Sequence, residues 1–161
     1  MDGVLVDNHH FHLEAWVIFC KKFNIDLTPE EFRLKMFGGN NRNLLEKVLN
    51  RPLTAKEIQQ YADEKELIYR QLHAPTIKGV DGVIEFITHL KEQNFRLAVA
   101  TAAPRENLDF VLSSLGIADY FDVTVDDSQV ENGKPDPEIY LKASTLLGVS
   151  PEKCVVFEAL S

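Results

Sequence analysis

This sequence of 161 residues is poor in cysteine and has no long apolar run. Cys20 and Cys154 form no CxxC motif, and two lone cysteines fit a reducing compartment better than a disulfide framework. No stretch approaches the roughly 20 apolar residues that a membrane span needs, and no charged leader precedes an apolar segment. These absences predict a cytoplasmic protein that has no membrane partner.

Basic residues are also few. There are 17 Lys and Arg against 25 Asp and Glu, which gives a formal net charge of −8, and no basic run offsets it. Affinity for the phosphate backbone depends on clustered Lys and Arg, so we expect no nucleic-acid partner. Hydrophobic residues make up 45% of the sequence, which is typical of a globular chain and excludes disorder. We expect a monomer.

The first half of the sequence has a helical pattern. Between residues 9 and 74 apolar side chains recur at helical spacing, and no segment resembles a strand. Thr28 and Thr54 each stand three residues before a glutamate, which is the pattern of a capping box at a helix start. The second of these helices is expected to run to about His73. This segment is therefore predicted to be a small helical bundle.

The pattern changes after Pro75, where helical segments alternate with short apolar runs. The expected helices cover 81–92, 105–115 and 137–147, and the expected strands cover 97–100, 123–125 and 154–157. Such alternation favours a parallel sheet with helical crossovers. The opening run GVLVD at 3–7 is expected to be a further strand of this sheet.

The predicted fold class is therefore α/β, with a Rossmann-like parallel-sheet core and an inserted helical bundle. We place the core in residues 1–8 and 79–161, and the insertion in residues 9–78.

Polar side chains follow the expected strands. Asp2, Thr101 and Glu158 stand at or near strand ends, and Lys134 lies in the loop that contains GKPDP at 133–137. In such sheets, sites form at the carboxyl ends of the strands. Carboxylates, a hydroxyl and an ammonium group together suit Mg²⁺ and a phosphoryl group. Taken singly, Thr101 could be an N-cap and Lys134 a solvated lysine.

Four motifs in this order resemble the haloacid dehalogenase superfamily, and within it the β-phosphoglucomutase-like branch of phosphatases and mutases. The matching pieces are MDGVLVDN at 1–8, Thr101 after its strand, GKPDPEIY at 133–140 and VVFE at 155–158. The resemblance implies Mg²⁺-dependent phosphoryl transfer through an aspartyl phosphate, with a small sugar phosphate as the substrate. It also implies that the helical insertion is a cap domain.

The resemblance assigns a role to each matching residue. Asp2 corresponds to the general acid/base, and its backbone carbonyl would face the metal, while Glu158 corresponds to a metal ligand. Thr101 and Lys134 correspond to the residues that bind the transferred phosphoryl group. Candidate substrate contacts are His12, Asn41, Arg42, Ala102 and Arg105.

Two departures from the family pattern leave three functions open. The nucleophilic aspartate would stand immediately before Met1, and Ala159 replaces an acidic residue. We expect a phosphatase, because Asn41 stands where the mutases carry a basic cap-loop residue, although Arg42 follows directly. A phosphohexomutase is the first alternative. A catalytically silent domain that binds a sugar phosphate is the second.

Overall fold

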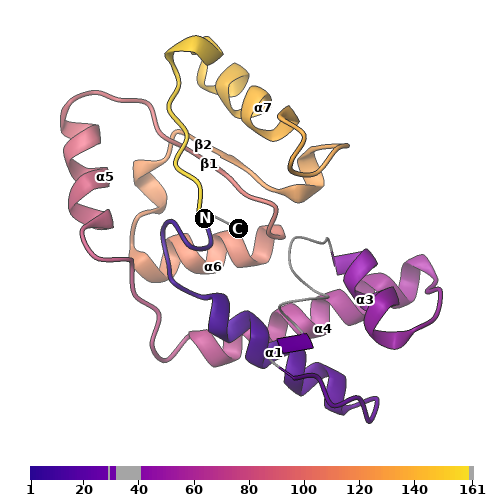
Figure 1. The fold of residues 1–161 in the computed structure, drawn as a ribbon. Coiled ribbons are helices and arrows are strands. Elements are labelled where there is room, and N and C mark those ends of the chain that lie inside the picture. Colours follow the sequence, from indigo (N-terminus) through magenta and orange to yellow (C-terminus); the bar gives the residue numbers. More distant parts are fainter. Residues whose placement is uncertain (29, 32–40, 160–161) are drawn as a thin grey trace. The chain divides into compact units, whose positions relative to one another are not determined.

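The computed structural model describes residues 1–28, 30–31 and 41–159, with the backbone alone for 41–43 (Figure 1). The chain forms two compact units. One consists of Met1–Asp7 and the described residues from Ile77 onward, and the other consists of Asn8–Thr76. Among the helices of these described residues, none is both long enough and apolar enough to cross a bilayer.

The second unit is helical. Its helices are α1 (His9–Lys21), α3 (Asn41–Leu49) and α4 (Ala55–His73). Helix α1 packs along α4. The core of the unit includes the buried side chains of Trp16, Phe19, Leu45 and Leu53. The predicted helical bundle is confirmed for the described residues of this unit.

Both predicted capping boxes form. The Thr54 hydroxyl accepts a hydrogen bond from the Glu57 amide, and the Glu57 carboxylate accepts one from the Thr54 amide at 2.9 Å. Thr28 and Glu31 pair in the same way, at 3.2 and 3.1 Å. The glycine pair at 38–39 lies outside the described residues.

The first unit is an α/β fold built on a parallel pair of strands. Strands β1 (Ala98–Ala100) and β2 (Val123–Val125) pair in register, with Ala98 opposite Val123 and Ala100 opposite Val125. Its α-helices are α5 (Val83–Glu92), α6 (Arg105–Leu115) and α7 (Glu138–Leu147), and its short 3₁₀ helices are η1 (Ala118–Tyr120), η2 (Asp127–Gln129) and η3 (Pro151–Lys153). The α/β class and the parallel pairing that the sequence predicts are confirmed.

Helices cover both faces of this sheet (Figure 1). Successive side chains of a strand point to opposite faces. Val99 accordingly packs in a cluster with Leu108 and Val111 of α6, whereas Ala98 and Ala100 pack with Ile139 of α7. The sheet is therefore the middle of three layers.

Two of the expected strands are absent from the described residues. Gly3 adopts a left-handed conformation, with φ of 70°, and the amides of Val4 and Leu5 both donate to the Met1 carbonyl. Residues 3–5 therefore form a turn between isolated bridges at Asp2 and Val6. The apolar character of this run reflects burial, because Leu5 and Val6 lie in the apolar cluster beside α6.

The expected strand at 154–157 is wrong for a related reason. A strand needs a hydrogen-bonded neighbour. The only strand pairing in the described residues is that of β1 with β2, and 81% of the Val155 surface is exposed. The apolar run VVF is therefore extended chain without a ladder.

Candidate active site

Lys134 connects three parts of the α/β unit. Its Nζ donates to Glu158 Oε2 at 2.5 Å and to the Ala100 carbonyl oxygen at 3.4 Å, and it lies 5.0 Å from the ring centroid of Tyr140. Ala100 is the last residue of β1, and Thr101 follows it directly. The ammonium group is thereby held at the carboxyl end of a parallel strand.

The loop that carries Lys134 is fixed by the start of α7. The Glu138 carboxylate accepts hydrogen bonds from the backbone amides of Glu131 and Asn132, each at 2.8 Å, and Asp136 accepts one from the Glu138 amide at 2.9 Å. The two amides lower the pKa of the Glu138 carboxyl. Glu138 therefore stays ionised and ties the loop to the helix.

Lys134 and Glu158 are both held in their charged forms. Burial opposes the charge of Lys134, but the hydrogen bonds to Glu158 and Tyr140 outweigh it and raise the pKa of the amine. Burial also opposes the charge of Glu158, yet the hydrogen bonds from Lys134 and Tyr140 lower the pKa of its carboxyl. Opposite charges in one cluster suit a site that binds an anion next to a cation.

The charges of this cluster also act on the amino group of Met1. Burial lowers its pKa, the charge of Asp2 opposes that effect, and the charge of Lys134 adds to it. Glu158 also acts on this amino group. Any residue joined ahead of Met1 would thus start within electrostatic reach of Asp2, Lys134 and Glu158.

Thr101 is almost fully buried directly beyond β1. Its amide donates to the Val125 carbonyl at 2.9 Å, and its hydroxyl accepts from the Ala103 amide at 3.2 Å. Ala102 is exposed next to it. The hydroxyl is held in a fixed place by its own loop, one residue after the carbonyl that Lys134 contacts.

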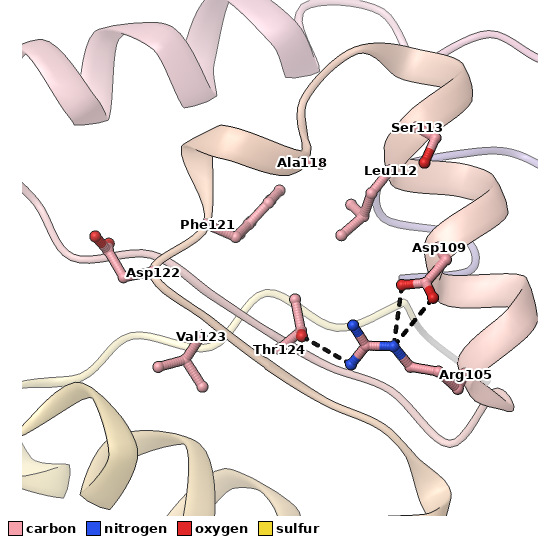
Figure 2. A pocket seen from close by; sticks show the side chains of 9 residues that line it. All are labelled: Arg105, Asp109, Leu112, Ser113, Ala118, Phe121, Asp122, Val123 and Thr124. Atoms are coloured by element: carbon pink, nitrogen blue, oxygen red, sulfur yellow. Dashed lines mark hydrogen bonds and ion pairs between the residues drawn. The ribbon is translucent and has the colours of Figure 1, made fainter.

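Arg105 has partners of its own in the α/β unit. Its Nε donates to Asp109, its Nη1 donates to Thr124 at 3.2 Å, and the same nitrogen lies 3.7 Å from the buried carboxylate of Asp126. Figure 2 shows this side chain among the residues that line a pocket of about 460 Å³, together with Leu112 and Phe121. The predicted contact of Arg105 with substrate stays a prediction.

The remaining predicted substrate contacts lie in the helical unit. The His12 ring stacks on Tyr69 with ring centroids 3.9 Å apart, and its Nδ1 lies 3.3 Å from Lys65 Nζ. Lys65 is buried with Glu66, which accepts its hydrogen bond at 2.8 Å. Asn41 and Arg42 begin α3, and their side chains lie outside the described residues.

The donor set of the α/β unit suits a hard cation. Within the described residues, no group of three or more His, Cys, Asp or Glu side chains gathers around one point. Mg²⁺ usually keeps several waters and binds through one or two carboxylates together with the substrate phosphate. The Glu158 carboxylate is a group of this kind, and the assignment of Asp2 and Glu158 as metal ligands stays a prediction.

Comparison with known proteins identifies the family. The model of the haloacid dehalogenase-like hydrolase family matches residues 1–158. This chain belongs to that family of enzymes. Its relatives in the family include both phosphatases and β-phosphoglucomutases.

Several relatives match nearly the whole chain. A phosphorylated carbohydrates phosphatase of Thermotoga maritima is 35% identical over 98% of this chain and 73% of its own length. The chloroplastic 5-amino-6-(5-phospho-D-ribitylamino)uracil phosphatase of Arabidopsis thaliana is 31% identical over 97% of this chain. The chain spans only 42% of that relative's length.

Solved structures of the family have the same fold. A HAD hydrolase of family IA, variant 3, from Entamoeba histolytica is 32% identical, and it superposes on 93% of this chain and 69% of its own with a TM-score of 0.85. A β-phosphoglucomutase from Clostridium difficile is 29% identical over 95% of this chain and 70% of its own, with a TM-score of 0.80.

Sequence reasoning missed two side chains that contact the predicted residues. Lys65 looks like a solvated helix lysine, and only its contacts with His12 and Glu66 reveal its burial. Tyr140 fits an apolar helix stripe, and its hydroxyl donates to Glu158 at 2.5 Å. Tyr140 could have been found from the sequence, because it is the last residue of the motif GKPDPEIY.

Proposed function

We propose that this haloacid dehalogenase-like chain catalyses Mg²⁺-dependent hydrolysis of a small sugar phosphate through an aspartyl phosphate. The observation that supports it best is the convergence of Lys134, Glu158 and the Met1 amino group beside the end of β1. Residues 1–8 and 79–161 would form the catalytic core, and residues 9–78 the cap.

In this proposal the nucleophile is an aspartate joined to Met1. Its carboxylate oxygen attacks phosphorus, the bond from phosphorus to the ester oxygen breaks, and Asp2 gives that oxygen its proton. Asp2 then takes a proton from the water that attacks the aspartyl phosphate, which releases inorganic phosphate and restores the aspartate. Lys134 and Thr101 donate to the phosphoryl oxygens, where negative charge accumulates.

The metal would be held by Asp2 and Glu158. When bound, Mg²⁺ offsets the negative charge of the phosphoryl oxygens. Glu158 needs no change of protonation to serve as a ligand, because the hydrogen bonds from Lys134 and Tyr140 hold its pKa low. Ala159 carries no carboxylate, so the ligands that we assign from this chain are the Glu158 carboxylate and the backbone carbonyl of Asp2, whose carboxyl group stays free for proton transfer.

A sugar phosphate is the proposed substrate, and His12, Asn41, Arg42, Ala102 and Arg105 are its proposed contacts. The Thermotoga maritima relative is named a phosphorylated carbohydrates phosphatase, which supports this class. A monomer in the cytoplasm stays our prediction.

Hydrolysis is favoured over the mutase reaction by the surroundings of Arg105. A mutase must hold the distal phosphate of a bisphosphate while it turns, ideally with cations that are free to bind it. The Arg105 guanidinium already donates to Asp109 and Thr124, which leaves only its remaining N–H groups for a substrate. Neutral asparagines such as Asn41 bind phosphate without the charge that makes an arginine contact about twice as strong.

One incubation tests the choice. The chain with an aspartate before Met1 is supplied with Mg²⁺, β-glucose 1-phosphate and a trace of hexose bisphosphate, and free phosphate and glucose 6-phosphate are followed together. We expect free phosphate to form faster. Faster accumulation of glucose 6-phosphate would identify a mutase, and binding without either product would identify a silent domain.

A further inference from the structure

Tyr140 contacts both of the charged groups that define the candidate site. Its hydroxyl donates to Glu158 Oε2 at 2.5 Å, and the Lys134 ammonium lies over its ring. Lys134 donates to the same carboxylate oxygen. The three side chains therefore form a closed set in which each touches the other two.

The position of the tyrosine ring is itself fixed by packing. Tyr140 lies in α7 (Figure 1). It packs against the apolar cluster to which Ile139 and Ala143 of the same helix belong. Glu158 and Lys134 stand in segments without regular structure, and 43% of the Glu158 side chain is exposed. Of the three, the tyrosine is the one that a helix holds in place.

We propose that Tyr140 is a positioning residue that holds Glu158 Oε2 against Lys134 and so fixes the ammonium group at the end of β1. The other oxygen of Glu158 accepts a hydrogen bond from the neighbouring Ala159 amide, at 3.3 Å. Without the hydroxyl, one of the two donors that orient the carboxylate is lost. The long Lys134 side chain then samples other rotamers.

The role of Tyr140 in phosphoryl transfer rests on the proposed function, whereas its effect on the position of Lys134 does not. We therefore test that effect without a substrate or a metal. The 161-residue chain and its variants are treated briefly with an amine-acylating reagent, and the labelling rate of each lysine is measured by peptide mass spectrometry. Lys91, which pairs with Asp122, serves as the internal reference.

Tyr140→Phe keeps the ring and removes only the hydroxyl. Loss of one hydrogen bond to a charged group should raise the labelling rate of Lys134 about three- to tenfold, while Lys91 is unchanged. Tyr120→Phe is the matched control, because this tyrosine packs in the apolar cluster beside α6. Tyr120→Phe should leave the labelling of Lys134 as it is in the parent chain.

Glu158→Gln approaches the same set from the other side. This variant should also speed the labelling of Lys134. The fold-increase in the double variant should be smaller than the product of the two single fold-increases, because both substitutions act through one oxygen. Unchanged labelling of Lys134 in Tyr140→Phe, or fully multiplicative effects, would overturn the proposal.

An activity assay separates the positioning role of Tyr140 from the proposed function. In the chain with an aspartate before Met1, Tyr140→Phe should lower kcat more than it raises KM for β-glucose 1-phosphate. If that parent chain releases no phosphate while Lys134 still responds to Tyr140→Phe, the proposed function fails and the positioning role stands. If the parent is active and Lys134 does not respond, the reverse holds.

Discussion

Gly3 and Ala159, near opposite ends of the sequence, meet so closely that a Cβ atom on Gly3 would lie 2.7 Å from the Cβ of Ala159. The turn at Gly3 follows Asp2, and Ala159 follows Glu158. This contact therefore places the segments that carry Asp2 and Glu158, the two proposed metal ligands, next to each other, and it leaves no room for a side chain at Gly3.

Replacement of Gly3 by alanine should strain the chain in two ways. The left-handed backbone costs an alanine about 1–2 kcal/mol, and the clash with Ala159 should cost about 1–3 kcal/mol more. Gly116→Ala is the control, because Gly116 has a φ of 67° with nothing within 4 Å of its Cβ position. Urea unfolding of both variants measures the difference.

A second substitution isolates the clash. Ala159→Gly in the Gly3→Ala background should reduce the loss of stability to that of Gly116→Ala. If Gly3→Ala and Gly116→Ala cost the same amount from the start, the contact between the two ends is not as close as described.

The helical unit should lose stability in acid through Glu57. Hydrogen bonds from Arg51 and Thr54 lower the pKa of its carboxyl to about 2, from 4.5 in the unfolded chain. A lowered pKa stabilises the folded state above about pH 4.5, and this contribution disappears as the pH falls toward about 2. The stability difference between the parent and Glu57→Gln should shrink through this window. If an NMR titration gives Glu57 the same midpoint in Arg51→Gln as in the parent, Arg51 is not the cause of the lowered pKa.

The two cysteines should react with a thiol reagent at different rates. Burial raises the pKa of the Cys20 thiol to about 11, so little reactive thiolate exists at pH 8. Cys154 is partly exposed. We expect one thiol to react quickly in the folded protein and the second only in denaturant, and Cys154→Ser should abolish the fast phase. A fast phase that survives in Cys154→Ser would show that Cys20 is accessible.

Asp2 should be required for turnover rather than for folding. In the chain with an aspartate before Met1, Asp2→Asn should lower kcat by about 10²- to 10⁴-fold, the usual contribution of a general acid/base. Steady-state phosphate release measures this loss, and unfolding of the same variant serves as the control. A kcat within about twofold of the parent value would remove Asp2 from this role.

The helices and the parallel strand pair could be predicted from sequence, because apolar periodicity and capping residues are local signals. Thr54 and Glu57, for example, mark the start of α4 correctly. The two expected strands that are absent failed for a non-local reason. An apolar run such as VVF predicts burial or pairing, but pairing depends on a neighbouring strand, and among the described residues VVF is exposed and pairs with none.

The residues of the candidate site also fall into two groups, those that a local sequence pattern identifies and those that it does not. Lys134 and Glu158 could be found because each stands in a motif, and the structure places them 2.5 Å apart. Lys65 could not be found, because a charged residue in a helix is normally exposed. Its burial depends on Glu66 and on His12 from another helix, and no local pattern reports such a contact.

Phosphate release tests the central claim most directly. Two versions of the chain are compared, one with aspartate and one with asparagine joined before Met1, each with β-glucose 1-phosphate and Mg²⁺. The Met1 amino group lies by Lys134 and Glu158, so the added carboxylate should start where an in-line nucleophile is needed. We predict metal-dependent release of phosphate by the aspartate version and none above background by the asparagine version. Equal release by both versions would contradict the account.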